Sequence, residues 1–62
     1  MINVLKIKSL MIEKGFTQET ISKQLGMSRQ NFSSIIRKGD TSISILDKIA
    51  HVLDVEPQIL LK

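Results

Sequence analysis

The sequence predicts an all-α fold, a compact bundle of five short helices, and three observations support this prediction. Apolar residues recur three or four positions apart, as on one face of a helix, and do not alternate as in a half-exposed strand. Gly15, Gly26 and Gly39 separate the apolar segments, at positions where helices commonly end. Apolar residues make up 42% of the chain and are mostly aliphatic. A chain of 62 residues fits one domain, expected to span residues 1–62.

The first two helices are expected over residues 2–14 and 18–25. One face of the first carries the apolar residues Val4, Ile7, Leu10 and Met11, at the spacing of an amphipathic helix. Gly15 ends this helix, and Phe16 then packs back on the core. Thr17 is a preferred N-cap residue for the second helix, whose buried face is supplied by Ile21 and Leu25.

The third and fourth helices are expected over residues 29–37 and 43–53, each preceded by a serine N-cap, Ser28 or Ser42. The buried side of the third is expected to consist of Phe32, Ile35 and Ile36, and the fourth carries an apolar stripe of Ile43, Leu46, Ile49, Ala50 and Leu53. Asp54 stands after the fourth helix, where glycine is commoner, because Asp tolerates the left-handed conformation.

A short fifth helix is expected at the C-terminal end of the chain, beginning at Pro57. Glu56 and Pro57 suit its N-cap and first helical position, since the proline lacks only an N–H that would be unpaired there. Ile59, Leu60 and Leu61 end it in succession, and three consecutive residues of one short helix cannot all face one core.

Charge is distributed unevenly along the chain, although the net charge is only +3. Residues 20–39 contain four cations and no acid, whereas residues 40–62 contain four acids and two lysines, a net charge of −2. A basic middle segment is what a surface facing a polyanion requires. An ordinary solvated face is the alternative interpretation.

Several function classes are disfavoured by the composition. There is no Cys and only one His, His51, so neither a disulfide nor a structural zinc site is expected. His51 has no catalytic or metal-binding partner in the pattern and should be an exposed, inert residue on the outer side of the fourth helix. No nucleophile with a base and no phosphate loop is present, which argues against an enzyme and against a cofactor. No membrane span or leader is recognisable, and we expect a cytoplasmic location.

Residues 18–37 have the pattern of a helix-turn-helix, two helices joined by a short turn that contains glycine. In such units the second helix enters the DNA major groove, so its outer face must be polar. With Phe32 facing inward, the residues expected outside are Arg29, Gln30, Asn31, Ser33, Ser34 and Arg37. This face carries no acid and no large apolar group, as base recognition requires.

The sequence also resembles a known family through an ordered set of short motifs. These are Gly15-Phe16-Thr17-Gln18-Glu19, Ile21, Leu25-Gly26-Met27-Ser28-Arg29-Gln30, Lys48-Ile49-Ala50 and Leu53-Asp54-Val55. The set is similar to the lambda-repressor-like, Xre/Cro-type helix-turn-helix family, and the resemblance covers the chain from Ile7 to Leu61. It implies a five-helix DNA-binding domain that often works as a homodimer on a two-fold operator. Two departures are Gly39, displaced behind Lys38, and Thr41 in place of a common proline.

The resemblance assigns Gln18 to a DNA phosphate and Arg29, Gln30 and Ser34 to base edges. Together with the outward face, it predicts base contacts from Arg29, Gln30, Asn31, Ser33 and Ser34. Phosphate contacts are predicted for Thr17, Gln18, Lys23, Ser28, Arg37 and Lys38. Thr17 and Ser28 are needed as helix caps in any case, and the three cations can serve solubility alone.

Two functions from different classes fit these features. The favoured one is a sequence-specific transcriptional regulator, of repressor type, whose partner is a double-stranded DNA operator and which needs no small-molecule ligand. The alternative is a protein-interaction module on the same fold, such as the partner that neutralises a toxin. The acidic tail and the extra apolar residues of the first helix favour the alternative.

A homodimer is expected because the chain has more apolar residues than the core of a single monomer requires. Ile2, Leu5 and Ile12 form a second stripe on the first helix, opposite to Ile7, and the C-terminal helix adds further aliphatic side chains. Scattered exposed aliphatic residues are also normal on protein surfaces. A small domain without staples nevertheless gains stability by burying a shared patch.

Overall fold

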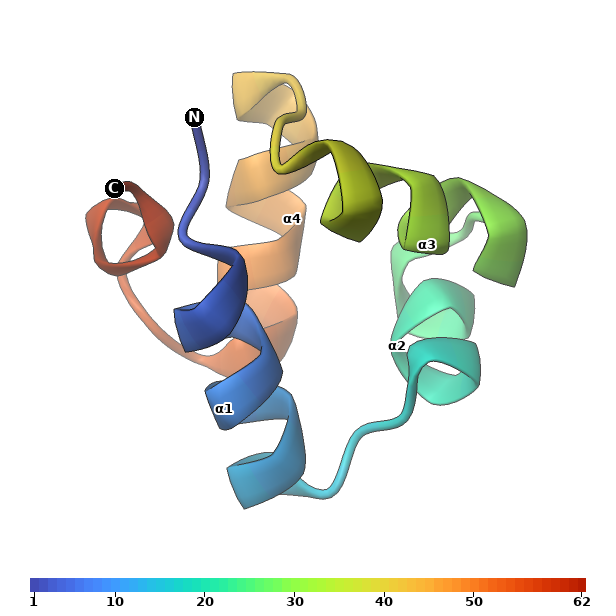
Figure 1. Ribbon diagram of the computed structural model, residues 1–62. Helices are drawn as coiled ribbons and strands as arrows, with labels where there is room; N and C mark the ends of the chain where they lie inside the picture. Colours follow the sequence, from blue (N-terminus) through green and yellow to red (C-terminus); the bar gives the residue numbers. More distant parts are fainter.

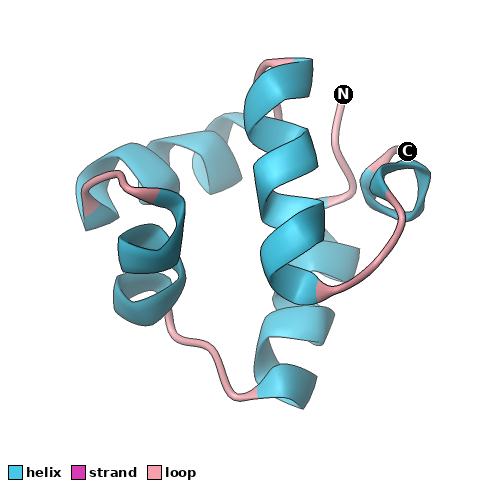
Figure 2. Cartoon of the chain, turned by 180° about the vertical axis from the view of Figure 1, so that it is seen from behind, coloured by secondary structure: helices cyan, strands magenta, loops and turns pink.

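The computed structural model describes residues 1–62 and contains four α-helices, one short 3-10 helix and no strand. The elements are α1 (Val4–Lys14), α2 (Gln18–Leu25), α3 (Arg29–Lys38), α4 (Ile43–Leu53) and the 3-10 helix η1 (Pro57–Leu60) (Figure 1). Short loops join them (Figure 2). The predicted all-α class is confirmed, and the fifth helix is a single 3-10 segment.

Local side-chain caps set most of the helix starts. The side-chain oxygens of Thr17, Ser28 and Ser42 each accept a hydrogen bond from the backbone N–H three residues later, at 3.1, 3.1 and 3.3 Å. These bonds satisfy N–H groups that have no partner within the helix. The three predicted N-caps are therefore confirmed. Asp54 follows α4 with a φ of 59°, the left-handed conformation expected of it.

The start of α1 differs from the prediction, because the helix begins at Val4 rather than at residue 2. Asn3 is the N-cap, and its side chain accepts a hydrogen bond from the Lys6 N–H at 3.1 Å. Ile2 lies outside the helix, forms an isolated antiparallel bridge with Leu61 and is only 2% exposed. Placing Ile2 in an exposed second stripe with Leu5 and Ile12 was therefore wrong, since the extended backbone at Ile2 turns its side chain into the core.

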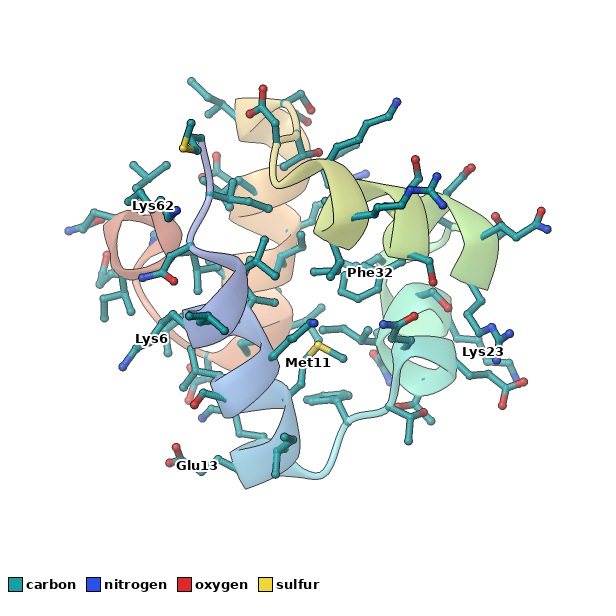
Figure 3. All side chains as sticks on the ribbon, viewed as in Figure 1. Lys6, Met11, Glu13, Lys23, Phe32 and Lys62 are labelled. Atoms are coloured by element: carbon teal, nitrogen blue, oxygen red, sulfur yellow. The ribbon has the colours of Figure 1, made fainter.

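The helix α4 lies in the middle of the molecule. On one side it packs against α1 and η1, and on the other side it contacts α2, which in turn packs against α3 (Figure 1, Figure 2). The side chains of Phe32 and Met11 point inward between these layers (Figure 3). The core consists of Ile2, Ile7, Leu10, Met11, Ile21, Leu25, Phe32, Ile36, Leu46, Ile49, Ala50, Leu53 and Leu60. None of the helices combines the length and the hydrophobicity that a membrane-spanning helix requires.

The two ends of the chain lie side by side and are joined by backbone hydrogen bonds. The Asn3 N–H donates to the Leu60 carbonyl at 2.7 Å, and the Lys62 N–H donates to the Met1 carbonyl at 3.5 Å. The Ile2 N–H donates instead to the Gly39 carbonyl, in the turn after α3, at 3.2 Å. Leu60 is fully buried, while its neighbours Ile59 and Leu61 are 42% and 47% exposed. This confirms that the three consecutive aliphatic residues do not all face the core.

Candidate nucleic-acid interface

A three-residue turn joins α2 to α3 and fixes the angle at which α3 lies on the protein. Gly26 takes the left-handed conformation with a φ of 72°, which a residue with a side chain rarely adopts. The Met27 N–H then donates to the Ser22 carbonyl at 3.0 Å, and the half-buried Met27 side chain packs on the core. The turn therefore presents α3 from a defined position over α2.

The two sides of α3 differ sharply in character. Phe32 is fully buried, Ile36 is 9% exposed, and Ile35 packs half-buried against the same core. The opposite side and the two ends expose polar and basic residues, namely Arg29, Gln30, Asn31, Arg37 and Lys38. The helix contains no acidic residue. The predicted polar outer face is thus present on a helix whose inner side packs against the core.

Two serines predicted to contact bases are less accessible than their neighbours. Ser34 is half-buried and lines a groove between α3 and the start of α4, together with Asn31 and Lys38. Ser33 is half-buried beside α2, and its hydroxyl donates a hydrogen bond of 2.5 Å to Oε1 of Gln18. This contact between residues 15 positions apart has no local sequence signal and was missed by the sequence analysis.

The residues predicted to contact phosphates lie at different parts of the surface, at the starts of α2 and α3, near the end of α2 and at the end of α3. Thr17 and Ser28 are exposed, and both hydroxyl oxygens act as caps. Thr17 forms a reciprocal pair with Thr20, because the Thr17 N–H donates to Oγ1 of Thr20 at 2.8 Å. Lys23 points away from the protein body at α2 (Figure 3) and lines a groove between α2 and α4 to which α3 contributes nothing. Lys23 thus lies at this groove, and its phosphate contact stays a prediction.

The turn after α3 follows a path set by Gly39 and Asp40. The helix extends to Lys38, one residue beyond the prediction, and the Gly39 N–H donates to the Ile35 carbonyl at 2.9 Å. Asp40 Oδ1 accepts a hydrogen bond from the Thr41 N–H at 2.9 Å, so the aspartate orders the turn without a proline. Arg37 and Lys38, in the last turn of α3, are exposed next to this turn and place two positive charges there.

His51 was predicted to be an exposed residue on the outer side of the fourth helix. It lies exposed in the last turn of α4, in the groove shared with Lys23, as expected for an outer residue. No three His, Asp or Glu side chains lie close enough together to hold a metal ion.

Comparison with known proteins identifies this arrangement. The chain matches the model of the Helix-turn-helix family HTH_3 over residues 7–60. This range includes α2 and α3, which carry the candidate interface. No curated protein and no solved structure matches the chain. Members of the family are typically non-enzymatic and bind DNA. The extent of the match, the all-α fold and the polar face of α3 agree, and the chain belongs to the Xre/Cro-type, lambda-repressor-like helix-turn-helix family of DNA-binding domains.

Proposed function

We propose that the protein is a sequence-specific transcriptional regulator of repressor type that inserts α3 into the major groove of double-stranded DNA. The observation that carries this proposal is the outer face of α3, which is polar, basic and free of acids, on a helix anchored through Phe32. A helix in the major groove reads base edges with such side chains. Binding to DNA would place the protein in the cytoplasm, on the nucleoid.

Base reading is best supported for the first turn of α3. Arg29 offers two parallel N–H donors, which match the O6 and N7 acceptors of guanine. The amides of Gln30 and Asn31 each provide one donor and one acceptor, the pair that adenine presents in the major groove. All three side chains are exposed. Ser34 can add a contact from the next turn, where its hydroxyl lines the groove beside α4.

Phosphate contacts would hold α3 in register without reading the sequence. Gln18 stands at the first position of α2, where the helix dipole favours an anion. Arg37 and Lys38 lie at the other end of the interface, after the last base-reading residue. The hydroxyls of Thr17 and Ser28 lie at the N-termini of α2 and α3 and can each donate to a phosphate while the oxygen remains a cap.

Removing a base-reading side chain should relax specificity. We expect Arg29→Ala and Gln30→Ala each to cost about 1–3 kcal/mol of discrimination at one operator position, because each deletes a bidentate contact. The measurement is a binding-site selection from a random duplex pool, followed by affinities for single-base variants of the selected operator. Gln24→Ala and Lys48→Ala, exposed residues on α2 and α4, are the controls and should leave base preference unchanged. An equal loss on operator and scrambled duplex would contradict base reading by the substituted residue.

Removing a phosphate-neutralising cation should change the salt dependence instead. We expect Arg37→Ala and Lys38→Ala each to weaken binding to all duplexes and to reduce the slope of log K against log salt by about one unit, because one fewer counterion is released. Titrations at four or five salt concentrations measure this slope. Lys6→Ala, a charge-matched variant on α1 (Figure 3), should keep the wild-type slope. Unchanged slopes for both Arg37 and Lys38 variants would remove the turn after α3 from the interface.

We further propose that the protein acts as a homodimer on a two-fold operator. Two recognition helices in successive major grooves lie about 34 Å apart. One chain, whose Cα positions extend 23 × 22 × 18 Å, carries a single α3, so contact with two half-sites would take two chains. Exposed aliphatic residues outside α3 can form the shared surface, among them Leu5 and Ile12 of α1 and Ile59 and Leu61 at the C-terminal end.

Sedimentation of the protein alone and on its selected operator tests the dimer. We expect two chains per operator at saturation, and a concentration-dependent monomer–dimer equilibrium without DNA. Leu61→Glu should shift this equilibrium towards the monomer, because it places a charge on the shared apolar surface. Binding of one chain per operator, together with a monomer at high concentration, would contradict the homodimer.

A further inference from the structure

One hydrogen bond links the side chains of two different helices. It joins Ser33 of α3 to Gln18 of α2, whereas every other hydrogen bond that involves a side chain spans at most three residues of sequence. Both partners are half-buried, so water competes less for this bond than for one on the open surface. The bond therefore fixes the Gln18 side chain relative to the recognition helix.

The direction of this hydrogen bond determines which end of the Gln18 amide faces outward. The Ser33 hydroxyl donates to Oε1 of Gln18, so the oxygen is turned towards α3. The amide nitrogen makes no hydrogen bond within the protein and keeps both of its N–H donors available. An amide that rotated freely would instead present its oxygen for part of the time, and an oxygen repels a phosphate.

We propose that Ser33 is a positioning residue, which reads no base but holds the Gln18 amide so that its N–H groups meet a DNA phosphate. This inference rests on the proposed function, and it replaces the base contact expected for Ser33 by an indirect contribution to affinity. The same bond ties the start of α2, where the phosphate is held, to the middle of α3, where bases are read. Phosphate contact and base reading are thereby set in one register.

The proposal predicts a particular pattern of losses. Ser33→Ala should weaken binding to all duplexes about 2- to 10-fold, the size of one net hydrogen bond, and should leave base preference unchanged. In a Gln18→Ala background the same substitution should cause no further loss, because the group that Ser33 positions is gone. Ser33→Thr keeps the hydroxyl and should retain most of the affinity.

A double-mutant cycle on the full chain tests this pattern. Wild type, Ser33→Ala, Gln18→Ala and the double variant are titrated by fluorescence anisotropy on the selected operator and on a scrambled duplex, with circular dichroism to establish that each is folded. Ser34→Ala is the matched control, since Ser34 is a half-buried serine of the same helix without a bond to Gln18. Its effect should be additive with that of Gln18→Ala.

A second measurement needs no DNA. In the free protein, ¹⁵N relaxation of the Gln18 side-chain amide should give a high order parameter in the wild type and a clearly lower one in Ser33→Ala. Equal order parameters would overturn the inference, and so would additive losses in the cycle or a change of preference at one base pair in Ser33→Ala. If the wild type binds no duplex, the proposed function itself fails, whereas duplex binding with additive losses removes only the role of Ser33.

Discussion

The variant Phe32→Ala should lose about 3–5 kcal/mol of unfolding free energy, the usual cost of deleting a buried phenylalanine side chain. Phe32 is fully buried and heads the set of the largest buried side chains. A domain of 62 residues has a total stability of about 3–9 kcal/mol at 0.05–0.15 kcal/mol per residue. The substitution should therefore remove about a third or more of the total stability and weaken DNA binding in step with the fraction unfolded, although the side chain is buried inside the protein.

Urea denaturation followed by circular dichroism measures this effect. Phe16→Ala is the matched control, because Phe16 is only half-buried at the edge of the core and the same deletion should cost about 1–2 kcal/mol. Similar losses for the two variants would show that α3 is not held mainly through Phe32. Normal stability of Phe32→Ala together with lost DNA binding would contradict the packing role assigned to this residue.

The second large effect is expected at the C-terminal end, where Leu60→Ala should cost about 2–5 kcal/mol and Leu61→Ala less than about 1 kcal/mol. Leu60 is fully buried in the cluster that contains Ile2 and Leu53, and its carbonyl accepts the Asn3 N–H. Leu61 is 47% exposed, so its truncation removes few contacts. The two variants differ by one position and by nothing else in their chemistry.

Thermal unfolding at low protein concentration separates these two leucines, since dilution keeps a dimer from adding to the stability. For a domain of this size a change of 1 kcal/mol shifts the Tm by about 4–8 °C, so the difference is easily resolved. Equal shifts for the two variants would mean that the last residues pack differently from the structure. A larger loss for Leu61→Ala would place that residue in the core.

Much of the fold could be predicted from residues close together in the sequence. A helix cap needs a side chain and an N–H three positions apart, so Thr17, Ser28 and Ser42 were recognisable without knowledge of the tertiary structure. Asp54 in the left-handed conformation was recognisable for the same reason. The exposure of Arg29, Gln30 and Arg37 followed from helical periodicity once Phe32 was placed inside.

Contacts between distant parts of the chain were not predictable in this way. The start of α1 was missed because Ile2 reads as a continuation of an apolar stripe, and only the bridge to Leu61 shows that its backbone is extended. The final segment is a 3-10 helix because four residues leave no room for a stable α-helix between Pro57 and the bridge to Ile2.

The sequence by itself thus determined which segments are helical, where most of them begin and end, and which side of residues 29–37 is polar, because these properties depend on neighbours within about four positions. Only the tertiary structure decided which aliphatic residues at the chain ends are buried, and that Ser33 faces Gln18 rather than solvent. The physical reason is that the turn at Gly26 sets the position of α3 on α2. A hydrogen bond across 15 residues exists only after that packing is complete.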